Sequence, residues 1–175
     1  MRRAKSCLII GAGICGLTAA KLLCEFGMRV SILEKSRGVG GRLATQRTEA
    51  GVFDHGAQSL TVRFEIFDSF VTEWHQRGLL SALGQRLRGL PGDPGTHQPH
   101  FRGITSMTAV PKFLAAALPH HPSQRAKRAE TCAGGWRVTT DQGSIFSGDA
   151  FGGMQIEGAT LSGFFAARQL LSLSH

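Results

Sequence analysis

The first third of the chain alternates short apolar runs with one stretch of helical periodicity. Residues 7–10 (CLII) form an apolar run that suits a buried parallel strand. Apolar positions then recur at Leu17, Ala20 and Leu23, which is the spacing of a helix. Residues 29–33 (RVSIL) form a second apolar run. The order strand, helix, strand predicts a βαβ unit with a parallel sheet.

The patterns in the rest of the chain are shorter and less regular. Apolar spacing predicts helices over 64–74 and 157–171, and a helix with proline in its first turn over 111–118. Residues 79–90 predict a short strand or two before a loop rich in proline and glycine. Residues 136–146 predict a β-hairpin. The chain as a whole is therefore predicted to belong to the α/β class.

A glycine-rich turn joins the first predicted strand to the first helix. Its sequence, GAGICG over residues 11–16, has the spacing GxGxxG. In this context Gly11 permits a tight turn, Gly13 lets the backbone approach a pyrophosphate, and Gly16 allows the helix to pack closely. The N-terminus of the helix then offers N–H groups and a positive dipole end to the phosphates. The turn predicts a dinucleotide site.

An acidic residue and a second glycine-rich loop narrow the choice of dinucleotide. Glu34 follows the second strand, where a carboxylate can accept hydrogen bonds from both hydroxyls of an adenosine ribose. It would repel a 2′-phosphate, which favours FAD or NAD over NADP. Residues 35–42 (KSRGVGGR) carry three cations, and Arg42 can pair with a phosphate oxygen. Such a loop suits FAD, with its ribityl arm, better than a nicotinamide cofactor.

Composition and charge exclude several classes of protein. The chain has 175 residues and 23 glycines, where about 12 are expected at average usage. The net charge is +8, but the basic residues are scattered and no nucleic-acid-binding motif is present, so no nucleic-acid partner is predicted. Four cysteines without CxxC spacing predict reduced thiols and a cytoplasmic location. Glycines interrupt the apolar run 6–20, which argues against a signal peptide, and no stretch is long enough to span a membrane.

These segments resemble the renalase-like flavoproteins, within the wider group of FAD-dependent amine oxidases. The resemblance rests on GAGICGLTAAKLL, ILEKSRGVGGRLATQR and FDHGAQSLTVR near the N-terminus, and on GDAFGGMQIEGA followed by LSGFFAARQLL near the C-terminus. It covers residues 5–77 and 148–171 well and the middle only thinly. It implies a Rossmann-like FAD/NAD(P)-binding domain with a parallel central sheet, a small β-hairpin or meander, and a truncated substrate domain.

The resemblance also implies a set of FAD-binding residues. Residues of the first glycine loop would contact the pyrophosphate, Glu34 the adenosine ribose, and Arg42 the phosphates. Residues 55–58 would pass close to the ribityl chain and flavin ring. Asp149 would reach the ribityl or phosphate region, and Ile156 would lie under the ring. The full predicted set is Gly11, Gly13, Cys15, Gly16, Glu34, Lys35, Gly41, Arg42, His55, Gly56, Ala57, Gln58, Asp149 and Ile156.

The domain organisation departs from that of the family. We expect residues 1–175 to form a single FAD-binding domain built from segments 1–77 and 148–175, with a reduced insertion over 78–147. Proteins of this group place a full substrate domain between Asp54 and the C-terminal segment GDAFGGMQIEGA, residues 148–159, which we call the closing motif. In this chain the walls of the substrate pocket and one central strand are therefore expected to be missing. A natural shortening, a deletion or a gene-model error would each explain this.

Two functions of different classes remain open. The first is an FAD-dependent oxidoreductase whose flavin accepts hydride from a reduced nicotinamide dinucleotide, NAD(P)H, or from an amine, and passes electrons to oxygen. The second is a non-catalytic remnant that binds FAD or ADP without a complete substrate pocket. A nicotinamide-binding Rossmann module fits less well, because it has no use for the second glycine loop. No catalytic acid or base and no metal site are predicted, and the oligomeric state is left open. Four histidines are expected to be surface residues of proline-rich loops: His97, His100, His120 and His121.

Overall fold

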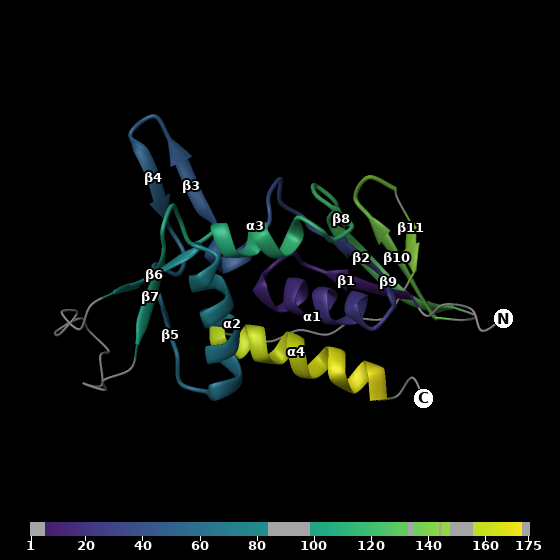
Figure 1. Cartoon of the computed structure of the whole chain (residues 1–175). Coiled ribbons are helices and arrows are strands. Elements are labelled where there is room, and N and C mark those ends of the chain that lie inside the picture. Colours follow the sequence, from purple (N-terminus) through teal and green to yellow (C-terminus); the bar gives the residue numbers. More distant parts are fainter. Residues whose placement is uncertain (1–5, 84–98, 133–134, 144, 148–155, 173–175) are drawn as a thin grey trace. The chain divides into compact units, whose positions relative to one another are not determined.

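The computed structural model describes residues 6–83, 99–132, 135–143, 145–147 and 156–172. The chain divides into two compact units (Figure 1). The first unit combines Met1–Gly41 with Pro111–His175, and the second is Arg42–Val110.

The first unit contains the βαβ arrangement that the sequence predicts. Strand β1 (Ser6–Ile10) leads into helix α1 (Ile14–Glu25), and β2 (Arg29–Leu33) pairs with β1 in parallel, with Ser6 opposite Arg29. A two-residue strand, β8 (His120–His121), pairs in parallel with the other edge of β2, giving the order β1-β2-β8. The predicted parallel sheet and α/β class are therefore confirmed.

An antiparallel meander completes the β structure of the first unit. It consists of β9 (Ala126–Cys132), β10 (Gly135–Thr140) and β11 (Ile145–Ser147), in the order β11-β10-β9. Val138 of β10 is buried against Leu8 and Leu33 of the parallel sheet. Burying side chains of this size contributes roughly 1.5–3 kcal/mol each, which joins the meander to the sheet. The predicted hairpin is confirmed.

Helix α4 (Ile156–Ser172) packs directly against α1, and both helices begin on the left in Figure 1. Their backbones approach closely at Gly163. A Cβ atom at this position would lie 2.1 Å from the carbonyl oxygen of Cys15 and 3.2 Å from the amide nitrogen of Ala19. Glycine is therefore required where α4 crosses the first turns of α1. The helix predicted over 157–171 is confirmed.

The second unit is a smaller assembly of hairpins around one helix. A short 3-10 turn, η1 (Gly41–Leu43), leads into the hairpin of β3 (Thr45–Thr48) and β4 (Gly51–Asp54). The remaining strands form an antiparallel sheet in the order β5-β7-β6: β5 (Leu60–Thr61), β6 (Leu80–Leu83) and β7 (His100–Gly103).

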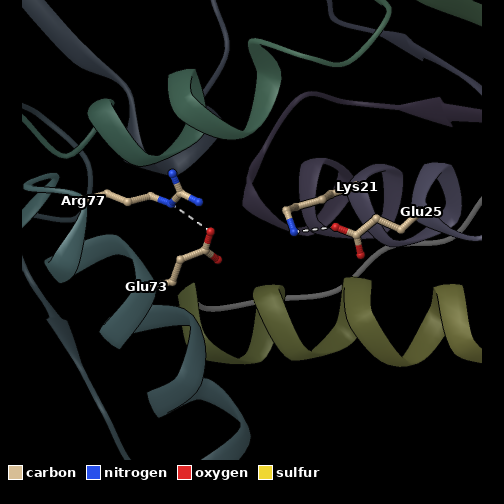
Figure 2. A network of polar contacts seen from close by, with 4 residues as sticks. All are labelled: Lys21, Glu25, Glu73 and Arg77. Carbon is tan, nitrogen blue, oxygen red and sulfur yellow. Dashed lines mark hydrogen bonds and ion pairs between the residues drawn. The ribbon is translucent and has the colours of Figure 1, made fainter.

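Helix α2 (Glu65–Gln76) supplies the core of this unit. Its side chains Phe67, Val71 and Trp74 are buried at helical spacing, as the sequence predicts. Ion pairs between residues four positions apart lie on α1 and at the C-terminal end of α2: Lys21–Glu25 at 2.6 Å, and Glu73 with the C-cap residue Arg77 at 2.9 Å (Figure 2). Both pairs are substantially exposed, so they contribute little to stability.

Three expectations need correction or fall outside the described residues. Helix α3 (Ala109–Ala115) begins and ends earlier than the predicted 111–118. His100 lies in β7, and the pair His120–His121 forms β8, so the prediction that these histidines lie in loops was wrong. Their strands are set by pairing with distant segments, which local composition does not reveal. His97 and the end of the segment 79–90 lie outside the described residues.

Candidate functional site

The first glycine loop leaves the carboxyl end of β1 and enters α1. Gly11 has φ +106°, a conformation that favours glycine, and its N–H donates to the carbonyl of Leu33 at 2.7 Å. Gly13 precedes α1 with extended backbone angles, φ −79° and ψ 174°. A Cβ atom at Gly13 would meet nothing within 4 Å. The backbone of the loop is therefore open at Gly13.

Gly16 has a packing role that the structure shows directly. A Cβ atom there would lie 2.2 Å from the carbonyl oxygen of Gly11 and 3.0 Å from Cγ2 of Ile9. The first turn of α1 thus rests on the end of β1, and no larger residue fits without a shift. This is the close packing that the third glycine of the motif predicts.

The N-terminus of α1 has the character of an anion site. No side chain caps it through a hydrogen bond, and its first turn contains no acidic residue. The first N–H groups of a helix have no partner within the helix, and the macrodipole places partial positive charge there. Because Gly13 leaves the approach open, a phosphate group can reach these N–H groups. Cys15, whose side chain is partly exposed, lies in this turn.

The carboxylate of Glu34 is anchored to the same loop. Glu34 is only 6% exposed. Its Oε2 accepts a hydrogen bond from the N–H of Ala12 at 2.8 Å, and its Oε1 accepts one from the N–H of Ser36 at 2.7 Å. A carboxylate offers about four acceptor positions, so both oxygens can accept further bonds from hydroxyl groups. The predicted ribose acid therefore lies at the glycine loop.

The second glycine loop packs alongside the first. Gly40 forms a parallel bridge with Gly13, and its N–H donates to the carbonyl of Ala12 at 2.9 Å. Gly41 has φ +53°, and a Cβ atom there would lie 3.4 Å from Cα of Gly13. The two loops thus present adjoining stretches of backbone. Lys35, the first residue of this loop, is exposed.

A second cluster of predicted residues forms within the second unit. The carbonyl of Arg42 accepts a hydrogen bond from the N–H of Ala57 at 2.9 Å. A Cβ atom at Gly56 would lie 2.0 Å from that same oxygen, so glycine is needed for the two segments to meet. His55 and Gln58 flank the contact and are exposed.

A polar network, which the sequence did not suggest, stabilises the end of the β3–β4 hairpin next to this cluster. Asp54 accepts a hydrogen bond from the hydroxyl of Thr45 and, on both carboxylate oxygens, from the N–H of Met107 at 3.1 Å. The hydroxyl of Thr108 donates to the carbonyl of Leu43 at 2.8 Å. The adjacency of Asp54 to His55 was the only sequence signal for this network, and it did not identify the partners.

Two predicted residues belong to the closing motif. Asp149 lies outside the described residues. Ile156 is the first residue of α4, whose later turns pack on α1. The structure thus brings together Gly11, Gly13, Cys15, Gly16, Glu34 and Gly41 in the first unit, and Arg42, His55, Gly56, Ala57 and Gln58 in the second.

The sequence did not indicate the segment 121–124, which forms hydrogen bonds with the backbone of Glu34 and Ser36. The N–H of Glu34 donates to the carbonyl of His121 at 3.0 Å, and the carbonyl of Glu34 accepts from the N–H of Gln124 at 2.9 Å. The N–H of Ser123 donates to the carbonyl of Ser36 at 3.0 Å. No motif marks these residues, so only the folded chain reveals them.

Parts of the chain are similar to known proteins. Residues 9–73 match the model of the NAD(P)-binding Rossmann-like domain. An L-amino-acid oxidase of Siganus canaliculatus is 45% identical over 65 residues, which cover 36% of this chain and 12% of that protein. A carotenoid phi-ring synthase of Streptomyces griseus is 34% identical over 105 residues, covering 59% of this chain and 20% of the relative. The chain therefore spans a fifth or less of these curated relatives.

Solved structures share the fold at low sequence identity. A protein of Photorhabdus luminescens described as an FAD containing monooxygenase superposes with a TM-score of 0.57 and 20% identity, covering 83% of this chain and 38% of that one. A putrescine oxidase variant from a redesign of cofactor binding gives a TM-score of 0.63 at 13% identity, covering 84% and 57%. The predicted Rossmann-like fold is confirmed. Within the described residues, no helix is long and apolar enough to cross a membrane.

Proposed function

We propose that this chain binds FAD and provides the dinucleotide site of an oxidoreductase similar to the renalase-like and amine oxidase flavoproteins. One observation carries the proposal. Gly13 has backbone angles that any residue can adopt and space for a larger side chain, so the fold itself does not demand glycine there. A ligand that must approach the backbone closely would explain why this position is glycine.

The chemistry of the surrounding groups fits the adenosine and pyrophosphate part of FAD. The pyrophosphate would lie over Gly13, at the uncapped start of α1. The ribose hydroxyls would donate to the remaining acceptor positions of Glu34, which is already oriented by Ala12 and Ser36. Gly41 adds accessible backbone beside Gly13.

The residues of the second unit and of the closing motif would serve the flavin half. Arg42 would bind a phosphate, and residues 55–58 would line the ribityl chain and ring. Asp149 would reach the ribityl or phosphate region, and the start of α4 at Ile156 would direct a positive dipole end towards the pyrimidine edge. Residues 1–175 would together form one FAD-binding domain in the cytoplasm.

The reaction follows from the proposed cofactor. FAD, when bound, supplies a ring that accepts hydride at N5 and returns electrons to oxygen. The donor would be a reduced nicotinamide dinucleotide or an amine. Two of the similar proteins, the L-amino-acid oxidase and the putrescine oxidase, bear names of amine-oxidising enzymes. The residues of this chain would bind and orient the cofactor, and none is assigned as a catalytic acid or base.

The second candidate is binding of FAD or ADP without catalysis. It is favoured by the short segment between Asp54 and Asp149, which in the resembling family holds a full substrate domain. The two candidates share the cofactor site and differ in whether a donor can reach the flavin.

Absorbance and titration separate these candidates. The purified chain should carry or take up FAD and should bind ADP, measured by calorimetry. Bleaching of the flavin on anaerobic addition of NADH or an amine would establish the oxidoreductase; a stable yellow protein that neither donor bleaches would favour binding alone. A folded chain that binds neither FAD nor ADP would refute both.

A matched pair of glycine variants tests the placement of the pyrophosphate. Gly13→Val should lower FAD affinity more than tenfold, because the side chain fills the space that the pyrophosphate needs. The unfolding free energy should change by no more than about 1 kcal/mol, the scale of a lost helix cap. Gly38→Val is the control, since Gly38 is exposed, also has open space, and lies outside the predicted set. Equal FAD affinity in both variants would contradict this placement.

A further inference from the structure

The backbone of Glu34 is held by the segment Pro119–Gln124, which contains the edge strand β8 and the turn that follows it. The N–H of Glu34 donates to the carbonyl of His121, and the carbonyl of Glu34 accepts from the N–H of Gln124. The N–H of Ser123 donates to the carbonyl of Ser36, whose own N–H binds the Glu34 carboxylate. Any shift of this segment therefore moves the carboxylate.

The segment adopts a conformation that needs support. Ser123 has φ 57°, and it is the one described residue other than glycine with a positive φ. The left-handed conformation is unfavourable for such a residue, because its Cβ atom crowds the following carbonyl oxygen. Strain of this kind persists only where surrounding contacts determine the backbone.

Two glutamines provide that support. Nε2 of Gln142, in the turn after β10, donates to the carbonyl of Ser123 at 2.6 Å. Nε2 of Gln124 donates to Oε1 of Gln142 at 2.7 Å. Oε1 of Gln124 accepts from the hydroxyl of Thr140, which is buried, at 2.8 Å. The side-chain amide of Gln142 thus links the turn after β10 (residues 141–143, the meander turn) to Ser123, which bonds Ser36 next to the Glu34 carboxylate.

We infer that the amide pair Gln124–Gln142 positions the carboxylate of Glu34 for the adenosine ribose, so that the meander turn controls affinity at the adenosine end of the site. The inference rests on the proposed function and extends it to residues that contact no cofactor. A binding group must be held within about 0.5 Å of its productive position by surrounding contacts. Loss of the Gln142 amide releases Ser123 from its strained backbone, which loosens the bond to Ser36 and shifts Glu34.

The test is ADP binding by Gln142→Ala, because ADP probes the adenosine end alone. Loss of the amide should weaken ADP binding about fivefold, the effect of one hydrogen bond. The control is Gln46→Ala, which removes an exposed glutamine of β3 in the second unit and should leave the Kd unchanged. Circular dichroism of each variant checks that it is folded. Gln142→Glu is a second variant that keeps the acceptor for Gln124 but removes the donor to Ser123, and it should also weaken binding.

A double-mutant cycle separates positioning from general stability. In a Glu34→Gln background, Gln142→Ala should cost no further ADP affinity, because it acts through the Glu34 carboxylate. In a Ser123→Gly background the cost should shrink, since no strain remains to be held. If the wild type binds ADP and Gln142→Ala binds it equally well, this inference is overturned but the proposed function is not. Strictly additive effects of Gln142→Ala and Glu34→Gln would have the same consequence. Failure of the wild type to bind ADP and FAD would overturn the proposed function as well.

Discussion

Substitution of Gly163 by alanine tests how closely α4 is seated on α1. The added Cβ would lie 2.1 Å from the carbonyl oxygen of Cys15, where ordinary contact requires at least 3.4 Å. The obstacle is backbone in the first turn of α1, so no side chain can rotate away. The helices must separate by more than 1 Å at the crossing, which costs about 1–3 kcal/mol by the usual scale of overpacking.

Alanine gains about 1 kcal/mol over glycine in helix propensity, so the net loss of unfolding free energy should be at most about 2 kcal/mol. For a chain of this size the melting temperature should fall by up to about 8 °C, measured by thermal unfolding followed by circular dichroism, and urea unfolding gives the free energy directly. Gln169→Ala, at an exposed position of the same helix, is the control and should change the unfolding free energy by about 0.5 kcal/mol or less. A Gly163→Ala variant that is more stable than wild type by the propensity term would show that α4 does not pack on α1 in this way.

Three further predictions concern the binding acid, the strained residue and the thiols. Glu34→Ala should weaken FAD and ADP binding by about 1–3 kcal/mol, the scale of a lost charged hydrogen bond, and calorimetry that shows full affinity would contradict its placement at the ribose. Ser123→Gly should raise the unfolding free energy by about 0.5 kcal/mol, because relief of the left-handed strain exceeds the entropic cost of glycine; urea denaturation that shows a loss would refute this. Burial, aided by the Glu25 carboxylate, raises the pKa of the Cys24 thiol. At any mildly alkaline pH its thiolate fraction is therefore smaller, and iodoacetamide should modify Cys24 more slowly than exposed Cys132, as followed by peptide mass spectrometry; equal rates would contradict the burial.

The features that the sequence predicted are those encoded within contiguous residues. The βαβ unit follows from apolar periodicity and from a glycine loop whose geometry depends on neighbouring positions, as Gly11 and Gly16 illustrate. The helix α2 was predictable because Phe67, Val71 and Trp74 form one buried face. In each case the local sequence pattern and the tertiary packing favour the same local structure.

The features that it did not predict depend on pairing between distant segments. Strand β8 has two residues, too few for a periodic pattern, and exists because β2 offers an edge for backbone pairing. The close crossing at Gly163 requires knowledge that α1 lies against α4. The amides of Gln124 and Gln142 are 18 positions apart, and polar residues in turns carry no signal for a specific partner. Their roles follow only from the folded structure.

Glu34 connects the stability of the glycine loop with its proposed use. Its carboxylate already accepts hydrogen bonds from the N–H groups of Ala12 and Ser36, so Glu34 stabilises the conformation of the first glycine loop before any ligand binds. Ordering a flexible loop on binding would cost affinity, and a loop ordered during folding avoids that cost. The ribose hydroxyls would then add bonds to a carboxylate that is fixed, instead of competing for one that is mobile. It follows that Glu34 variants should lose stability in the absence of cofactor as well as affinity, because the same two oxygens serve both purposes.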